Sequence, residues 1–247
     1  MKDQQQKSDS VFFISDLHLS PKYPQITDRF KAFIENKARH ARALYILGDL
    51  FEYWLGDDAT DALAEEVAVS LSQLAQGNTQ IYYMHGNRDF LIGEEFAQRC
   101  QFEILPDPII HTIFDRSWIL THGDALCTDD QAYQAVRRIV REPSWQQDFL
   151  LKSISERIAF AEEARKKSSQ HTQTANDDIM DVNQQAVSNL FDEHAQTLCI
   201  HGHTHRPAVH RHDNNTRVVL GDWHNSSSYV LMKPNGYQLI HGAMDEQ

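Results

Sequence analysis

The sequence predicts an α/β fold, and two observations carry the prediction. Short apolar runs end in glycine or polar residues, as strands do, and stretches with helical spacing of apolar residues lie between several of them. Residues 44–47 illustrate the pattern, because four bulky apolar residues followed by Gly48 and Asp49 indicate a buried strand that ends in a tight turn. Open α/β sheets bind ligands at the carboxyl ends of their strands, so we expect Asp49 to lie at such an edge.

The first half of the chain alternates predicted strands and helices. The strands, each a short apolar run, are residues 11–14, 44–47 and 80–84. The helices are residues 26–37 and 61–75. In the first helix Ile26, Phe30 and Phe33 recur at the spacing of one helical face, and Gly77-Asn78 is a typical stop for the second.

The second half has a long helical segment before its last strands. The predicted strands are residues 118–121, 197–200, 217–220, 228–232 and 237–240, the last two joined by a hairpin turn at Asn235-Gly236. The predicted helices are residues 132–140, residues 144–166 and a third that runs through residue 190. Asp181 with Gln184 resembles a capping box, so we expect the third helix to start there.

Composition limits the classes of protein that the chain can be. Its 247 residues suffice for a full core, and 41% hydrophobic residues fit a folded globular protein. Three widely spaced cysteines do not make a disulfide framework, which favours a reducing compartment. We expect no signal peptide, since the first ten residues are polar, and no transmembrane helix. The net charge of -12 argues against general nucleic-acid binding.

Residues of the types that bind metals follow five of the predicted strands. They are Asp16 and His18, Asp49, Asn87, His122, and His203 with His205. Each pair or single residue alone also fits a polar turn, but the repetition favours a metal site in which two ions share the Asp49 carboxylate. We expect Asp16 and His18, and likewise His203 and His205, to face one site from extended turns. Mixed oxygen and nitrogen ligands suit Mn, Fe or Zn.

Two further residues beside the third strand have predicted roles. Arg88 follows Asn87 and offers a planar fork suited to phosphate oxygens, although a surface arginine in a turn is the alternative. His85 is expected to be structural.

The helical segment differs in charge from the rest of the chain. Residues 137–167 contain eight Lys or Arg and five Asp or Glu, a net charge of +3 in a chain of net charge -12. A solvated helical hairpin is one interpretation. The other is a lid whose basic face meets anionic lipid headgroups and whose apolar stripe meets acyl chains.

The order D-x-H, G-D, G-N-R-D, H-G and G-H-x-H resembles the calcineurin-like metallophosphoesterase superfamily. Within it, the chain resembles the UDP-2,3-diacylglucosamine hydrolase family of lipid A biosynthesis. The segments that carry this closer resemblance are residues 14–19, 48–54, 179–183 and 201–207. The resemblance implies one domain, residues 1–247, built as a sandwich of two β-sheets flanked by helices, with a helical cap insertion at about residues 127–182 over the active site.

The resemblance also implies the roles of the site residues. One metal ion, usually Mn²⁺, is expected on Asp16, His18, Asp49 and His205. The second is expected on Asp49, Asn87, His122 and His203. The implied catalytic residues are Arg88 and His203. The implied substrate contacts are Asn87, Arg88, Asp130, Ser168, Thr172 and His203. Thr172 stands where the family more often has asparagine and Ala175 where its cap offers a lysine, a contact that Lys166 or Lys167 could replace.

The implied reaction is hydrolysis of the pyrophosphate bond of UDP-2,3-diacylglucosamine by water attack on the α-phosphorus. The products are then 2,3-diacylglucosamine 1-phosphate (lipid X) and UMP, formed by a peripheral, monomeric enzyme on the cytoplasmic face of the bacterial inner membrane. One alternative is a metallophosphoesterase acting on a soluble nucleotide or phosphodiester. Another is a non-catalytic module on the same scaffold, a class that tends to lose metal ligands, whereas all seven are present in this chain.

Overall fold

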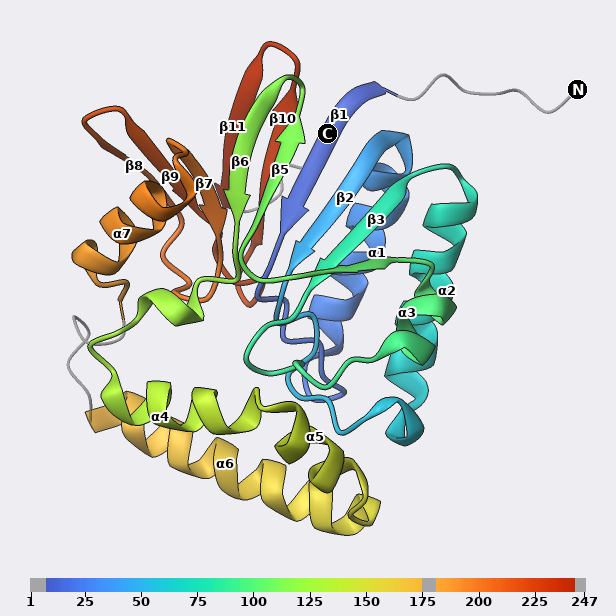
Figure 1. Ribbon diagram of the computed structural model, residues 1–247. Helices are drawn as coiled ribbons and strands as arrows, with labels where there is room; N and C mark the ends of the chain where they lie inside the picture. The colour runs from blue at the N-terminus through green and yellow to red at the C-terminus, as the bar shows by residue number, and fades with distance from the viewer. Residues whose placement is uncertain (1–7, 175–180, 243–247) are drawn as a thin grey trace, which may run out of the picture.

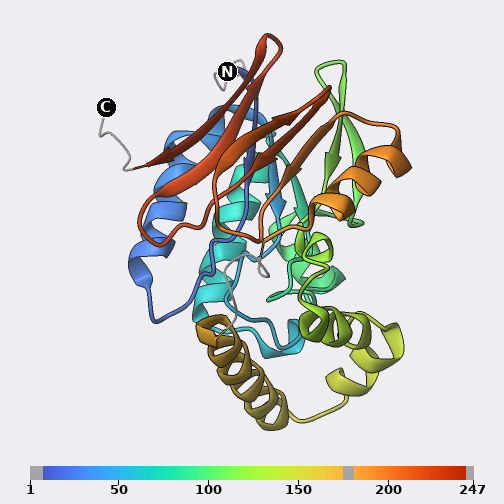
Figure 2. The same cartoon turned by 90° about the vertical axis from the view of Figure 1, so that its left-hand side faces the viewer.

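The computed structural model describes residues 8–174 and 181–242, without the side chains of residues 167–174. Two β-sheets face each other, and helices cover their outer faces and one of their ends (Figures 1 and 2). The α/β prediction and the implied sandwich of two sheets are confirmed.

The first sheet has six strands in the order β11-β10-β1-β2-β3-β4. Their bounds are β1 Ser8–Ile14, β2 Ala41–Leu47, β3 Gln80–Met84, β4 Glu103–Leu105, β10 Ser227–Lys233 and β11 Gly236–Gly242. β1 to β4 pair in parallel, with Phe12 opposite Leu44 and Leu44 opposite Ile81, whereas β10 is antiparallel to β1. The carboxyl ends of the parallel strands therefore lie at one edge.

The second sheet has five strands in the order β5-β6-β7-β9-β8. Their bounds are β5 Ile109–Ile113, β6 Arg116–Leu120, β7 Leu198–His201, β8 Ala208–His212 and β9 Asn215–Val219. β6, β7 and β9 are parallel, while β5 and β8 are antiparallel edge strands. The sequence did not indicate β4, β5 or β8, because β4 is only three residues long and the edge strands β5 and β8 are largely exposed.

Alternation along β1 explains how the first sheet holds the layers together. Val11 and Phe13 point toward the second sheet and join the core between the sheets, whereas Phe12 and Ile14 point toward the helices. Both faces are buried, so the strand reads as a continuous apolar run. Burial of each such side chain contributes about 1.5–3 kcal/mol.

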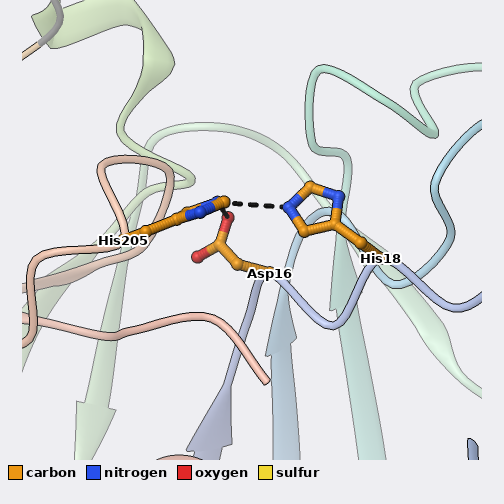
Figure 3. A group of neighbouring side chains, drawn as sticks. All are labelled: Asp16, His18 and His205. Atoms are coloured by element: carbon orange, nitrogen blue, oxygen red, sulfur yellow. Dashed lines mark hydrogen bonds and ion pairs between the residues drawn. The ribbon is translucent and has the colours of Figure 1, made fainter. Parts of the chain in front are cut away.

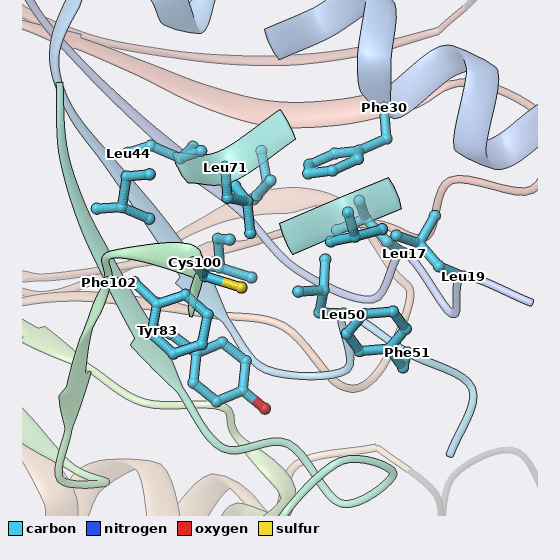
Figure 4. Close-up of a cluster of buried hydrophobic side chains, with 14 of the residues drawn as sticks. Leu17, Leu19, Phe30, Leu44, Leu50, Phe51, Leu71, Tyr83, Cys100 and Phe102 are labelled. Atoms are coloured by element: carbon cyan, nitrogen blue, oxygen red, sulfur yellow. The ribbon is translucent and has the colours of Figure 1, made fainter. Parts of the chain in front are cut away.

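Helices cover the outer faces of both sheets. The outer helices are α1 Pro24–Asn36, α2 Ala62–Gln76 and α3 Glu94–Cys100 on the first sheet, and α7 Gln184–His194 beside the second. Figure 4 shows part of the core under α1 and α2, where Phe30 and Leu71 belong to the same buried cluster as Leu44 of the sheet. Short 3-10 turns are Ala38–His40, Asp57–Ala59 and Asp124–Leu126.

Three helices lie across the end of the sandwich toward which β1, β2 and β3 point (Figure 1). We call them the cap helices: α4 Gln131–Val140, α5 Pro143–Leu150 and α6 Ile154–Thr174. The prediction of one helix over residues 144–166 was wrong. Ser153 and Glu156 form a capping box, in which the Glu156 carboxylate accepts from the Ser153 backbone at 2.9 Å, so a new helix begins there.

The start of α7 also differs from the prediction. Its N-cap is Asn183, whose side-chain oxygen accepts from the Ala186 backbone N–H at 3.0 Å. Asp181 instead accepts from Val182 and pairs with Arg206. Aspartate and asparagine both cap helices well, so the sequence alone did not distinguish Asp181 from Asn183, and the path of the chain selects Asn183.

The three cysteines are free, in agreement with the prediction that they make no disulfide framework, and all three are buried. None of the helices in the described ranges is both long and apolar enough to cross a membrane.

Candidate metal centre

All seven predicted metal-binding side chains lie on loops that follow parallel strands. These loops follow β1, β2, β3, β6 and β7, and they converge at the end of the sandwich that faces the cap helices. The convergence follows from topology, because parallel strands bring their carboxyl ends to one edge. The structure therefore brings these distant segments together at one place.

Asp16, His18 and His205 form the first group (Figure 3). The Nε2 atoms of His18 and His205 are 3.1 Å apart, and His205 Nε2 is 3.5 Å from Asp16 Oδ1. Asp49 Oδ2 lies 3.8 Å from His18 Nε2. Two imidazole lone pairs and two carboxylates directed at one point fit a divalent cation.

Asp49, Asn87, His122 and His203 form the second group. His122 Nε2 is 3.8 Å from Asp49 Oδ2 and 3.0 Å from Asn87 Oδ1, and His203 Nδ1 is 2.9 Å from the same amide oxygen. Asp49 is thus within 3.8 Å of a histidine in each group. This position is the one that a carboxylate shared by two cations requires.

Oxygen atoms behind three of the rings favour one nitrogen of each ring facing the site. His122 Nδ1 lies 2.8 Å from the Leu47 carbonyl oxygen and donates to it, so in the neutral ring that binds a cation Nε2 carries the free lone pair. His18 Nδ1 is 3.3 Å from Glu52 Oε2, and His205 Nδ1 is 3.7 Å from Asp222 Oδ2. Carboxylates behind imidazoles are the usual arrangement in metal sites, so the residues present fit a cation.

The buried charges of the centre also favour a cation. Burial lowers the pKa of His122, but the carboxylates of Asp49 and Asp16 outweigh it and raise the pKa to about 9. Burial raises the pKa of Asp16, yet His205 holds it well below its usual range. Burial raises the pKa of Asp49. Burial and the charge of His122 lower the pKa of His203 to about 3, so this ring is neutral and able to act as a ligand.

The backbone of the site is in the left-handed region at most of the ligands. The φ angles are +55° at Asp16, +51° at His18, +53° at Asp49, +67° at His203 and +55° at His205. The predicted extended turns were therefore wrong, although the side chains still converge. Each such conformation costs on the order of 1 kcal/mol and is typical of functional sites whose surroundings hold them in place.

Two glycines are required because loops pass close to the carboxylates. A Cβ at Gly86 would collide with the Asp49 carboxylate, and one at Gly202 would collide with Asp16. The glycines of G-N-R-D and G-H-x-H therefore make room for the ligands of neighbouring loops.

Asp89 is a structural member of the centre whose role the sequence did not reveal. Its buried carboxylate accepts four backbone N–H groups, from Asp49, Leu50, Phe51 and Gly86, at 2.7–3.3 Å. One side chain thus holds the loop after β2 against the loop after β3. Its position as the last residue of G-N-R-D, two residues after the predicted ligand Asn87, is the sequence feature that could have pointed to it.

α4 is attached beside the second group through a buried aspartate. Asp124 accepts from the Tyr133 hydroxyl at 2.6 Å and from Arg137 Nε at 2.8 Å. The Tyr133 ring stacks on His203 with centroids 5.9 Å apart, and Arg141 donates to the Gly86 carbonyl at 2.8 Å.

α6 is attached through two arginines that the sequence did not single out. Arg157 is 3% exposed, forms two hydrogen bonds to the Asp58 carboxylate and donates to three backbone carbonyls, including that of Leu55. Arg165 lies 3.1 Å from Glu52 Oε1. Burial raises the pKa of Glu52, but the neighbouring His18 ring and the charge of Arg88 lower it to about 2.

A cavity of about 200 Å³ lies between the cap helices and the metal centre. Most of its wall is apolar. The apolar lining residues are Trp54, Leu55, Phe90, Leu91, Val136, Val140, Trp145, Phe149, Phe160, Ala161 and Ala164. Arginines also line it, namely Arg88, Arg137, Arg141 and Arg165.

Only some of the predicted substrate contacts line the cavity. Asn87 and Arg88 line the cavity, and Asn87 also reaches His203. Asp130 does not line it and is the N-cap of α4, accepting from Tyr133 N at 2.9 Å. The side chains of Ser168, Thr172 and Lys167 lie outside the described part, as does Ala175 entirely. His85 has the expected structural role, since its Nε2 lies 2.7 Å from the Ile92 carbonyl oxygen.

Comparisons with known proteins agree with this geometry. The sequence profile of the family described as calcineurin-like phosphoesterase matches residues 10–207. A UDP-2,3-diacylglucosamine hydrolase of Aromatoleum aromaticum is 47% identical over 225 residues, which are 90% of this chain and 92% of that protein. Proteins of the same name are 43% identical in Xanthomonas oryzae pv. oryzae (95% of this chain, 100% of that protein) and 44% identical in Haemophilus influenzae (89% and 93%).

Proposed function

The chain belongs to the UDP-2,3-diacylglucosamine hydrolase family of calcineurin-like phosphoesterases, and from this premise we propose that it hydrolyses UDP-2,3-diacylglucosamine in lipid A biosynthesis. The observation that carries the proposal is that the candidate metal centre and an apolar cavity are neighbours. A cluster of carboxylates and imidazoles, suited to cations, lies beside an apolar cavity lined with arginines, and Asn87 contacts the cluster and also lines the cavity. A substrate with a pyrophosphate next to acyl chains fits both, with the pyrophosphate at the metal centre and the acyl chains in the cavity.

The proposed reaction cleaves the bond between the α-phosphorus and the bridging oxygen of the pyrophosphate. The water oxygen ends on UMP, and the bridging oxygen leaves with 2,3-diacylglucosamine 1-phosphate (lipid X). A phosphate leaving group needs little protonation, so the site requires no dedicated general acid.

The residues that would hold the cations are those of the two groups. One cation would be held by Asp16, His18, Asp49 and His205, and the other by Asp49, Asn87, His122 and His203. When bound, two divalent cations lower the pKa of water and neutralise charge on phosphoryl oxygens. We propose Mn²⁺ for both, since hard oxygen and imidazole nitrogen ligands suit it.

Arg88 is proposed to stabilise the phosphoryl oxygens in the transition state. Its backbone N–H donates to Asp49 Oδ1 at 2.8 Å, which fixes the residue beside the shared carboxylate, and its side chain lines the cavity. A planar guanidinium can make two parallel hydrogen bonds to phosphate. His203, neutral and next to Asn87, is proposed to add a second polar contact at the same end.

The cap helices are proposed to cover the acyl chains. Trp145, Phe149 and Phe160 of α5 and α6 form an aromatic cluster in the cavity, with Trp145 and Phe149 stacked at 4.9 Å. A soluble nucleotide would leave this apolar wall without a partner. Asp130, Ser168 and Thr172 remain proposed polar contacts of the substrate.

The outer surface of the cap helices is proposed to meet the cytoplasmic face of the inner membrane. Apolar side chains are exposed at the turn between α5 and α6, with Leu151 85% exposed and Ile154 44% exposed, and Lys152 lies between them. Apolar side chains can enter the headgroup region while the lysine pairs with anionic lipids. The enzyme is proposed to act there as a peripheral monomer.

Product analysis in heavy-oxygen water tests the reaction. The Mn²⁺-loaded protein is expected to convert UDP-2,3-diacylglucosamine to UMP that carries one label and to unlabelled lipid phosphate. UDP or free phosphate as product, or label on the lipid, would overturn the proposal. A UDP-sugar without acyl chains is the matched control, and equal or faster hydrolysis of it would favour the soluble-substrate alternative.

A further inference from the structure

Glu52 lies between a predicted metal ligand and the cap helices. Its Oε2 atom is 3.3 Å from His18 Nδ1, and its Oε1 atom is 3.1 Å from the guanidinium of Arg165 on α6. The side chain is 20% exposed. Its backbone is also fixed, because Glu52 N–H donates to the Leu19 carbonyl at 3.1 Å and Leu19 N–H donates to Leu50. The two carboxylate oxygens therefore serve different parts of the molecule from one fixed position.

We propose that Glu52 is a positioning residue that couples the docking of α6 to cation binding at His18. Only a carboxylate can do this, because it accepts at both oxygens, whereas an amide offers one acceptor. The carboxylate oxygen 3.3 Å from Nδ1 favours the tautomer with the proton on that nitrogen, which leaves the Nε2 lone pair toward the site, 3.1 Å from His205 Nε2.

The coupling has a physical direction. A cation on Nε2 withdraws electron density from the imidazole, so the Nδ1–H becomes a stronger donor and holds Glu52 more firmly. Oε1 is then kept in place to receive Arg165, and α6 docks more stably. Because coupling between two binding events is reciprocal, a docked α6 must also raise the affinity of the site for the cation.

His122 and His205 have no comparable connection to α6 within the described residues. Asp222 stands behind His205 at 3.7 Å, but its other described contact is with the neighbouring His224 backbone. His122 is backed by the Leu47 carbonyl of β2. Asp222 is thus a carboxylate of the same type, in the same relation to a ligand of the same cation, without contact to the cap helices.

The second attachment of α6, through Arg157, limits which part of the helix responds to cation binding. Arg157 joins the start of α6 to Asp58 whether or not a cation is present, since none of its five hydrogen bonds involves the metal centre. The coupling should therefore act on the part of α6 around Arg165, next to the cavity where the substrate is proposed to bind.

The inference rests on the metal centre of the proposed function, and its test uses Co²⁺ with the full-length, metal-stripped protein. Affinity and geometry are measured from the visible absorption of Co²⁺, and docking from hydrogen–deuterium exchange of the α6 amides with and without Co²⁺. The variants are Glu52→Gln and Arg165→Met, with Asp222→Asn as the matched control.

In the unmodified protein, Co²⁺ is expected to slow exchange around Arg165. Glu52→Gln should lose this protection and bind Co²⁺ about tenfold more weakly, the usual effect of losing a partner behind a ligand. Arg165→Met should lose the protection but bind Co²⁺ only a few-fold more weakly. This change removes the contact of Arg165 with Glu52 and leaves the contact of Glu52 with His18 in place. Asp222→Asn should weaken Co²⁺ binding but keep the protection.

Equal protection of α6 in Glu52→Gln and the unmodified protein would overturn the coupling. So would stoichiometric Co²⁺ binding by the unmodified protein without any change in α6. Failure of the proposed function is distinguishable, because the unmodified protein would then bind no Co²⁺ or release no UMP from the lipid substrate.

Discussion

The replacement Asp89→Asn tests how the metal centre is held together. The Asp89 carboxylate accepts four backbone N–H groups, two on each oxygen: Asp49 and Gly86 on Oδ1, Leu50 and Phe51 on Oδ2. Asparagine replaces one oxygen by an NH₂ group, which faces two N–H donors and can accept from neither. Two buried donors are therefore left unsatisfied, and the charge that strengthened the other two bonds is lost.

The expected loss of stability follows from this count. Each unsatisfied buried donor costs about 1–3 kcal/mol, so Asp89→Asn should reduce the free energy of unfolding by about 2–6 kcal/mol. For a chain of this size, a loss of that order lowers Tm by roughly 10 °C. It is a large share of the stability of a typical domain, about 5–15 kcal/mol.

Urea unfolding in the presence of a chelator measures this loss without a contribution from bound cations. The matched control is Asp61→Asn, where the side chain caps α2 by accepting from Ala64 N–H at 2.8 Å. Asparagine caps a helix as well as aspartate, so this control should change stability by less than about 0.5 kcal/mol. An Asp89→Asn protein as stable as the control would refute the assignment of Asp89.

Three other predictions follow from single contacts. Arg88→Ala should lower turnover of the lipid substrate at least a hundredfold, on the order of one lost transition-state donor, while metal content measured by elemental analysis persists. Leu151→Glu should weaken binding to anionic vesicles at least tenfold in a co-sedimentation assay, whereas Val69→Glu, on the exposed face of α2, should not. The hydrogen bond from Arg157 lowers the pKa of Asp58 below its usual 3.8, so the stability from this pair is fully present well above 3.8 and is lost as the pH falls from there through the lowered pKa of the folded state. Asp58→Asn should therefore melt below the unmodified protein at pH 6, and the difference should shrink toward pH 3.

Each of these has a clear contrary result. Near-normal turnover of Arg88→Ala would remove that residue from the mechanism. Equal vesicle binding by the Leu151 and Val69 variants would place the membrane contact elsewhere. A constant difference in Tm from pH 6 to pH 3 would show that the Asp58 carboxylate does not stabilise the fold through its charge.

The sequence by itself determined the α/β class and the order of the main strands, and it supplied the residues that are proposed as ligands. These features are readable because each depends on neighbours within a few residues. The run before Asp49 is buried on both faces and ends in Gly48, which specifies a strand and a turn without reference to the rest of the chain. Parallel pairing then places all such turns at one edge.

Only the tertiary structure decided which groups stand behind the ligands and how the cap helices are attached. Ser153 and Glu156 were a local signal for the break before α6 and could have been recognised in the sequence. The contacts of Glu52 with His18 and Arg165 could not, because no local pattern specifies which arginine of a helix reaches which carboxylate of a distant loop. The left-handed backbone at the ligands is likewise a tertiary effect. Such strained conformations persist only where the surrounding loops, held by residues such as Asp89, fix the path of the chain.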